Sequence, residues 1–238
     1  MNSIKPIVNV RHLGRIGYNK ALQIQEACIK AINDAAKEQV KPNNTLLLLE
    51  HQPVYTVGIR SKLYSKEEEN KLKALGADFV RTNRGGLITF HGPGQLVAYP
   101  ILYLGDFNAR RSIKWYVENL EKTIINMSNA FDIKATTSPY TGVWVGNDKI
   151  AAIGIHRDRN VTSHGVAINC DIDLTWFSHI VPCGIPDRGV TSLSRLLGRT
   201  VTVSEALPPF LGAFQDHFNC HLAGWSPDRV SFQCGNTP

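Results

Sequence analysis

Apolar side chains in residues 112–131 recur at spacings of three and four, which is the pattern of an amphipathic helix. Residues 16–40 repeat the pattern more loosely, again with the apolar side chains on one face. The positions that carry the two patterns are Ile113, Val117, Leu120, Ile124, Met127 and Phe131, and Leu22, Ile29, Ile32 and Ala36. Both segments are therefore predicted to be helices that bury one face against a core.

Local start and stop signals predict further helices. Residues 65–76 begin with a capping box formed by Ser65 and Glu68, and Gly76 is a C-terminal stop signal. The remaining helical segments are residues 173–180, with Asp173 as the expected N-cap, and a C-terminal part that contains residues 208–218.

Strand-like segments are shorter and are separated by glycine-rich turns. They are residues 46–50, 53–59, 78–82, 86–91, 95–104, 142–145, 149–155 and 163–170. Gly146-Asn147-Asp148 between two of these segments is a hairpin signature, and Gly92-Pro93-Gly94 is a second turn.

The N-terminal segment has two open interpretations. Residues 6–13 fit a first strand, but no acidic residue precedes Glu26 and several basic ones do. A basic, acid-poor beginning is also compatible with a mitochondrial targeting segment.

Strands outnumber helices, and hairpins interrupt any alternation of strand and helix. We therefore predict an α/β protein of the α+β kind, with a mixed, largely antiparallel sheet flanked by helices. No linker or repeat is visible, so residues 1–238 are expected to form one domain with a substantial core.

Composition narrows the classes of function. The chain is 43% hydrophobic, and its longest apolar runs have strand length, so neither disorder nor a membrane association is expected. The net charge of +6 suits an acidic partner, which could be a nucleic acid or an acidic carrier protein. There is no lysine/arginine block and no RNP-like aromatic motif, which disfavours nucleic acid.

Five cysteines without a Cys-x-x-Cys pair argue against a disulfide framework and against a zinc ribbon. No set of histidine, cysteine or acidic residues has the spacing of metal ligands, so we expect no metal and no cofactor. Cys28 and Cys170 lie within a predicted helix and at the end of a predicted strand, where cysteines are usually core residues.

Cys183 is the cysteine with the most chemical interest. It stands between Pro182 and Gly184 in a predicted loop, just past a short helix. Glycine lets a ligand come close to the backbone, and a thiol there can act as a nucleophile if a cationic or basic group lies beside it. The alternative is an inert small side chain.

Lys149 opens the strand of residues 149–155, and nearly all the residues that follow it in that strand are apolar. A lysine at the start of a strand is most often a solvated charge. If the strand carries it into a dry pocket, desolvation favours the neutral amine, which can act as a base. The sequence alone does not show whether Lys149 and Cys183 meet.

Glycines are unusually dense in residues 84–95, with the sequence RGGLITFHGPGQ. Glycine is costly in a sheet, so this density is expected where backbone lies against a ligand, with Arg84 and His91 flanking the site. Two tight turns around a hairpin would explain it equally well. The spacing matches neither a P-loop nor a dinucleotide-binding motif. His164 in a neighbouring strand could be a ligand contact or a satisfied core histidine.

Taken together, these segments resemble the lipoyl(octanoyl) transferases. The resemblance rests on residues 84–102 (RGGLITFHGPGQLVAYPIL), 149–155 (KIAAIGI), 162–174 (TSHGVAINCDIDL) and 180–193 (IVPCGI followed by GVTSL). It covers about residues 7–218, and the segments 140–145 and 173–184 look most like those of the animal mitochondrial members.

The resemblance implies the fold of biotin and lipoate protein ligases and the first step of protein lipoylation. Octanoyl-acyl-carrier protein would be the donor, and the acceptor a lysine on a lipoyl domain, as in 2-oxoacid dehydrogenases and the glycine cleavage H protein. It also implies a mitochondrial matrix location, or a cytoplasmic one for a bacterial protein. A monomer is expected.

The family's acyl-thioester cysteine corresponds to Cys183 and its basic partner to Lys149. The family's substrate-contacting segments correspond to Arg84, Gly85, Gly86, Leu87, Ile88, Thr89, Phe90 and His91, to Ala152, Ile153 and Gly154, and to Gly165, Val166 and Ala167.

Two other functions compete with octanoyl transfer. An ATP-dependent lipoate or biotin ligase of the same fold would use its lysine on an adenylate and would not need Cys183. A non-enzymatic binding protein would use the basic surface for nucleic acid or a carrier protein, with salt-sensitive binding and no acyl transfer.

Overall fold

The computed structural model describes residues 5–108, 110–181 and 188–226. Its large sheet has the strand order β10-β8-β9-β6-β2-β1-β11, and β7 pairs with β8 beside this path. These strands are β1 (Ile7–Ile16), β2 (Thr45–His51), β6 (Gln95–Ile101), β7 (Val143–Val145), β8 (Asp148–Asp158), β9 (Val161–Asn169), β10 (Gly189–Val190) and β11 (His221–Ala223). The central neighbours β2, β6, β9 and β8 are antiparallel, whereas β1 and β10 add parallel pairings toward the edges.

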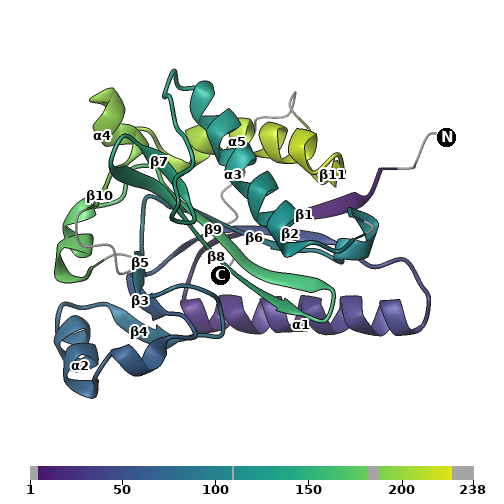
Figure 1. The fold of residues 1–238 in the computed structure, drawn as a ribbon, viewed down its shortest axis with the longest axis horizontal. Helices are drawn as coiled ribbons and strands as arrows, with labels where there is room; N and C mark the ends of the chain where they lie inside the picture. Colours follow the sequence, from purple (N-terminus) through teal and green to yellow (C-terminus); the bar gives the residue numbers. More distant parts are fainter. Residues whose placement is uncertain (1–4, 109, 182–187, 227–238) are drawn as a thin grey trace, which may run out of the picture.

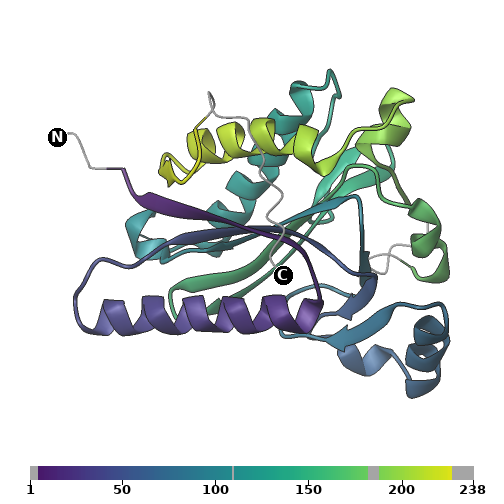
Figure 2. The same cartoon turned by 180° about the vertical axis from the view of Figure 1, so that it is seen from behind.

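Helices cover both faces of the large sheet, as Figures 1 and 2 show. One face carries α1 (Tyr18–Lys37), and the other carries α3 (Ile113–Asn129) and α5 (Val203–His217), which pack on each other. Alternate strand residues supply the two cores, since side chains along a strand point to opposite faces. Leu46 and Leu48 face α3 and α5, whereas Leu47 and Leu49 face α1.

A smaller sheet of order β4-β3-β5 lies beside the large one. It consists of β3 (Val54–Val57), β4 (Asp78–Arg81) and β5 (Thr89–His91), next to α2 (Lys66–Ala74) and a third apolar core. The short helices η1 (Ser61–Leu63), η2 (Leu104–Asp106), η3 (Leu174–His179) and α4 (Leu193–Leu197) complete the described elements.

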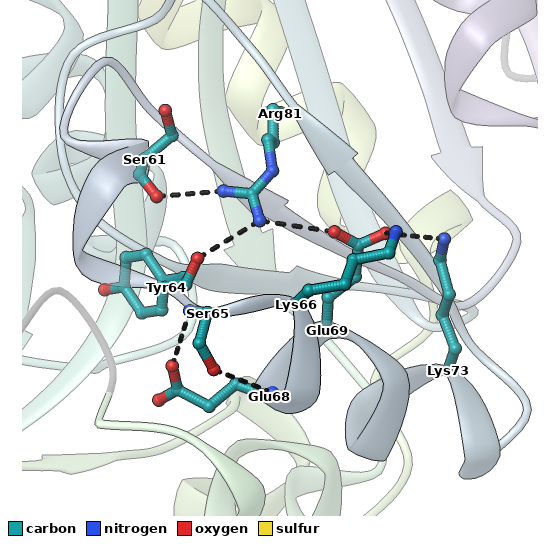
Figure 3. Close-up of polar contacts among 8 residues, drawn as sticks. All are labelled: Ser61, Tyr64, Ser65, Lys66, Glu68, Glu69, Lys73 and Arg81. Carbon is teal, nitrogen blue, oxygen red and sulfur yellow. Dashed lines mark hydrogen bonds and ion pairs between the residues drawn. The ribbon is translucent and has the colours of Figure 1, made fainter.

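Glu69 ties α2 to the small sheet, as Figure 3 shows. Its carboxylate accepts hydrogen bonds from Lys66 and Lys73 at 2.7 Å each and from Arg81 of β4 at 3.2 Å. The hydrogen bonds from these cations, led by that of Lys66, lower the pKa of Glu69 to about 2. Arg81 also donates to the carbonyl oxygen of Ser61 at 2.8 Å, which holds η1 against the same strand.

The predicted fold class is confirmed, and the helix signals hold in detail. Ser65 and Glu68 form the expected capping box of α2, and Gly76 follows that helix with φ +91°. Asp173 accepts a hydrogen bond from the backbone of Thr175 as the expected cap of η3. The N-terminal segment is a strand, β1.

The predicted C-terminal helical part is α5, which begins at Val203 and runs through nearly all of residues 208–218. Thr202 caps it by accepting from the backbone N–H of Glu205, so both prolines, Pro208 and Pro209, lie inside the helix. The Thr-x-x-Glu spacing is the sequence signal for this beginning.

The turn at Gly92-Pro93-Gly94 does not close a hairpin. β5 pairs with β3 in the small sheet, whereas β6 pairs with β2 and β9 in the large sheet, so the turn carries the chain from one sheet to the other. A Cβ atom on Gly94 would stand 2.5 Å from the carbonyl oxygen of Asp171, and its φ is +81°. The tight crossing therefore requires glycine at this position.

Within the described residues, no helix is both long and apolar enough to cross a bilayer.

Candidate active site

An inner pocket lies between the large sheet, the small sheet and the beginning of α1. Three glycine-rich segments line it, as the sequence predicts. Its lining comprises Arg84, Gly86, Leu87, Thr89, His91, Ala152, Ile153, Gly154, Gly165, Val166 and Ala167, joined by Tyr18, Val97, Tyr99 and His164. Strand pairing explains the convergence, because Ala152 lies opposite Ala167 and Gly154 opposite Gly165.

Three of the residues expected to contact substrate do not line the inner pocket. Ile88 and Phe90 belong to the core of the small sheet, where Phe90 stacks on Trp176 with ring centroids 4.8 Å apart. Strand alternation is the reason, because Thr89 and His91 face the pocket and Phe90 points the other way. Gly85 instead lines the neighbouring groove, and its N–H donates to the carbonyl oxygen of Ile155 at 2.8 Å.

Arg84 holds the glycine-rich loop in its shape. Arg84 is 6% exposed, and its guanidinium donates to the carbonyl oxygens of Gly85, Leu87 and Thr56 at 2.9, 3.1 and 2.7 Å. These bonds curl the loop around the side chain and place Leu87 at the pocket. The structure therefore assigns Arg84 a clear positioning role at the wall of the pocket.

Gly154 lets this loop lie close to β8. A Cβ atom there would stand 3.0 Å from Cδ of Arg84 and 3.2 Å from the carbonyl oxygen of Gly85. The close approach of the Arg84 loop to β8 is a physical reason for glycine at position 154.

Gly154→Ala is therefore expected to displace the Arg84 loop by a few tenths of an ångström and to slow a reaction catalysed at this pocket roughly tenfold to a hundredfold, because small misplacements at a reacting centre are costly. Gly212→Ala is the matched control. Gly212 lies in α5 with open space around its Cα, so alanine there should stabilise the fold by about 0.5–1 kcal/mol without slowing the reaction. Equal effects of the two substitutions on the rate of the catalysed reaction would contradict the packing argument.

Buried tyrosines and histidines form a cluster at the inner pocket. The Tyr18 hydroxyl lies 3.4 Å from Nδ1 of His164, and Nε2 of His51 lies 2.8 Å from the Tyr99 hydroxyl. His91 contacts this group through its ring, with centroids 6.2 Å from Tyr18 and 5.7 Å from His51. His164 is thus both a pocket residue and a satisfied buried histidine.

Burial keeps these histidines neutral. Desolvation lowers the pKa of His51 to about 4 and that of His164 to about 3, and it lowers the pKa of His91 well below the usual value. The positive charge of Arg84 adds to the effect at His91 and His164. Desolvation likewise raises the pKa of Tyr18 and of Tyr99. The histidines and tyrosines of the cluster are therefore polar but uncharged.

Stability is expected to fall as the pH drops below about 6.5. Above that pH the histidines are neutral in both the folded and the unfolded chain. Below it these histidines bind protons in the unfolded chain but not in the folded one, which favours unfolding. Each of His51, His91 and His164 then lowers the free energy of unfolding by about 1.4 kcal/mol per pH unit, until the pH reaches its pKa in the folded state. Urea unfolding at pH 7.5 and 5.0 measures this loss, and equal free energies of unfolding at the two pH values would contradict it.

An outer groove of about 420 Å³ adjoins the inner pocket. The two cavities share Gly86, Leu87, Ile153 and Gly154, so they meet where the glycine-rich loop crosses the edge of β8. Lys149 lines the outer groove and not the inner pocket.

Lys149 is buried, with 6% of its surface exposed, and is not a solvated strand-edge charge. Its Nζ donates to the carbonyl oxygen of Thr141 at 3.2 Å and lies 4.7 Å from the centre of the Trp144 ring. The parallel strand β10 pairs Val190 with it. Arg188 reaches the same aromatic ring, with its guanidinium carbon 5.5 Å from the ring centre.

Cys183 lies outside the described residues, as does Cys234. The cysteines that the structure describes have environments typical of unreactive thiols. Cys170 is fully buried, and desolvation raises its pKa to about 12. Burial also raises the pKa of Cys220 to about 12 and increases that of the half-buried Cys28.

Sequence reasoning missed Tyr18, Val97, Tyr99 and His51. The alternation along residues 95–104 puts Val97 and Tyr99 on one face, but it does not say which face carries the pocket. Nothing in the local pattern around Tyr18 distinguishes it from an ordinary residue at the beginning of a helix. In the described part of the chain, no group of three or more histidine, cysteine or acidic side chains could hold a metal ion.

The fold is that of lipoate protein ligases. A structure of lipoate-protein ligase A bound with ATP superimposes with a TM-score of 0.67, 12% identity, and coverage of 92% of this chain and 88% of that one. The bipartite lipoate protein ligase of Thermoplasma acidophilum gives a TM-score of 0.66, 13% identity, and coverage of 93% and 86%.

Residues 17–215 match the family described as the lipoyl protein ligase A/B catalytic domain, and the chain belongs to this family. A zebrafish (Danio rerio) relative named octanoyl-[acyl-carrier-protein]:protein N-octanoyltransferase, mitochondrial, is 58% identical over 93% of this chain and 97% of its own. The Homo sapiens protein of the same name is 45% identical over 92% and 96%.

The comparisons confirm the resemblance to the animal mitochondrial octanoyltransferases and the enzyme class, that of an acyltransferase in protein lipoylation. They also confirm the predicted mitochondrial location.

Proposed function

We propose that this protein transfers an octanoyl group from octanoyl-acyl-carrier protein to a lysine of a lipoyl domain, through a thioester on Cys183 with Lys149 as its basic partner. The observation that carries the proposal is a buried lysine, Lys149, in the lining of an outer groove that shares four residues with the inner pocket. An acyl chain in the inner pocket would present its carbonyl carbon where the two cavities meet.

Chain connectivity is compatible with a contact between the two residues. Cys183 precedes Arg188 by five positions, and Arg188 packs on the same Trp144 ring as Lys149. An extended chain spans at most about 3.6 Å per residue, so the five intervening steps do not exclude such a contact. The cationic side chains at this ring would favour the thiolate over the thiol.

The reaction proceeds in two half-steps. The Cys183 thiolate attacks the octanoyl thioester carbonyl, and the carrier's thiolate leaves and takes up the proton that Lys149 removed from Cys183. The acceptor lysine, as the neutral amine, then attacks the Cys183 thioester. Lys149 takes the proton that the amine loses, and Cys183 leaves as a thiolate. A thioester is exchanged for a more stable amide, so no nucleotide is consumed.

The partners follow from the chemistry of both half-steps. The donor is an acylated carrier protein, and the acceptors are lipoyl domains such as those of the 2-oxoacid dehydrogenases and the glycine cleavage H protein. Carrier and lipoyl domains of this kind are typically acidic, which suits the net charge of +6. We also propose that the chain acts as a monomer with one catalytic domain.

An intact-mass experiment tests the proposal. The protein is incubated with octanoyl-acyl-carrier protein without ATP, and then with an unmodified lipoyl domain. A mass increase of one octanoyl group on the enzyme, followed by its transfer to the lipoyl domain, is expected. Absence of the adduct, or transfer that strictly requires ATP, would instead favour a ligase mechanism.

A further inference from the structure

Residues 59–63 gather exposed apolar and cationic side chains on one short turn. Ile59, just before η1, is 67% exposed, and Leu63, the last residue of η1, is 66% exposed. They are the two most exposed large apolar side chains in the described part of the chain. Arg60 and Lys62 between them are exposed too, and neither makes an ion pair with a described residue. Scattered single apolar side chains are normal on a surface, but this combination within five residues indicates an interaction surface.

Hydrogen bonds hold the backbone of this segment in place. Arg81 of β4 donates to the carbonyl oxygens of Ser61 at 2.8 Å and of Tyr64 at 3.2 Å, as Figure 3 shows. The backbone N–H of Ile59 donates to the carbonyl oxygen of Arg84 at 2.9 Å. A partner that binds the exposed side chains therefore has little backbone to order, which lowers the entropic cost of binding.

This segment adjoins the outer groove. Arg60 lines the groove together with Lys149, and so does Tyr140, which is 47% exposed. Arginine and tyrosine are among the residue types that most often carry large shares of the binding energy at protein interfaces. Arg60 thus connects the exposed apolar side chains of residues 59–63 with the groove that the buried Lys149 lines.

We propose that residues 59–63 and Tyr140 form the docking surface for the acceptor domain, an inference that rests on the octanoyl-transfer function proposed above. In that mechanism the acceptor amine gives its proton to Lys149, so the amine must enter the outer groove. A lysine side chain extends only roughly 6 Å from its Cα, through five bonds of about 1.5 Å each. The acceptor's backbone must therefore lie at the groove. The carrier protein bears its thioester on a long flexible arm, so its protein part can stay outside the groove.

Charge also favours an acidic domain as the partner. Residues 59–64 contain no acidic side chain, and the glutamates that follow in α2 are already bonded to lysines of the same helix or to Ser65. Arg60 and Lys62 therefore remain available to carboxylates of the acceptor domain. Such exposed charges mainly speed association and set orientation, whereas burial of Ile59 and Leu63 supplies affinity.

The test separates docking of the acceptor from the chemistry. Ile59→Asp and Leu63→Asp each place a carboxylate against the acidic domain and remove apolar contact area, so each is expected to raise the KM for the lipoyl domain at least about tenfold. The rate of adduct formation from octanoyl-acyl-carrier protein should stay within about twofold of wild type. Val40→Asp is the matched control and should change neither quantity. Val40 is 57% exposed and follows the end of α1 that points away from the small sheet (Figure 1).

Hydroxylamine serves as an acceptor that needs no docking. It takes the octanoyl group from the enzyme as the hydroxamate and leaves the free thiol, and the rate of this step should be the same in Leu63→Asp and wild type. A loss that is confined to the lipoyl domain therefore reports docking.

Calorimetric titration with the unmodified lipoyl domain tests the surface without the covalent step. If the wild type forms no adduct but Leu63→Asp binds the domain at least about tenfold more weakly than Val40→Asp does, the proposed thioester is wrong and the docking surface stands. Unchanged binding and KM in both aspartate variants would overturn the inference. So would slower adduct formation from the carrier with an unchanged KM for the lipoyl domain, which would assign the surface to the donor. Leu63→Gln replaces the aspartate variant if that variant does not fold.

Discussion

Cys183→Ala is expected to form no octanoyl adduct and to lose at least about 10³-fold in transfer to lipoyl domains, because the variant has no nucleophile to carry the acyl group. The chain has other cysteines, so the result must be specific to this one. Intact mass after incubation with octanoyl-acyl-carrier protein measures the adduct, and the rate of lipoyl-domain octanoylation measures transfer.

Cys28→Ala is the matched control. Cys28 lies half-buried on α1, packed against the core on that side of the sheet, and burial raises the pKa of its thiol. This variant should therefore form the adduct and transfer it at the wild-type rate. An adduct on Cys183→Ala, or its loss in Cys28→Ala, would remove Cys183 from the mechanism.

Lys149→Met is expected to reduce transfer by roughly 10²- to 10⁴-fold, the usual contribution of a positioned acid–base group. Methionine retains much of the apolar length that packs against Trp144, so the fold should survive while the amine is lost. Single-turnover measurements resolve the two half-steps, and circular dichroism checks the fold. Lys114→Met is the matched control, since the Lys114 side chain on α3 is 86% exposed.

Lys149→Arg separates the two roles proposed for the amine. Arginine keeps a positive charge and can lie over Trp144, but it does not give up its proton in proteins. The variant should therefore retain part of the thiolate stabilisation and lose the base function, so that attack by the acceptor lysine slows more than formation of the adduct. Wild-type rates for both half-steps in Lys149→Met would exclude Lys149 from the mechanism.

Local signals were sufficient for most of the elements. The capping box at Ser65 and Glu68 and the heptad-like spacing along α3 depend on residues within one or two turns, so they can be read without knowing the fold. The hairpin of β7 and β8 is encoded by a few residues at its turn. The predicted turn at Gly92-Pro93-Gly94 is also present, but local signals did not show that it joins two sheets.

At the candidate site, too, some features could be predicted from local sequence and others could not. In the glycine-rich segments, residue type alone indicates that backbone comes close to other groups. Most of the residues in these segments line the inner pocket. Phe90 and Ile88 fall within the same segment but point into the small core, because the face that each strand residue adopts depends on which sheet covers it. Residue type alone could not show which side chains of the segment face the pocket.

By itself, the sequence determined the helices, most of the strands, the family and the small residues at which backbone segments come together. The tertiary structure decided which side chains share a cavity. It brings Tyr18 of α1 to the lining of a pocket whose walls come from β6, β8 and β9, and it buries Lys149 beside Trp144 and β10. These contacts join residues far apart in the chain, and they form through sheet register and helix packing, which no local pattern of hydrophobic and polar residues encodes.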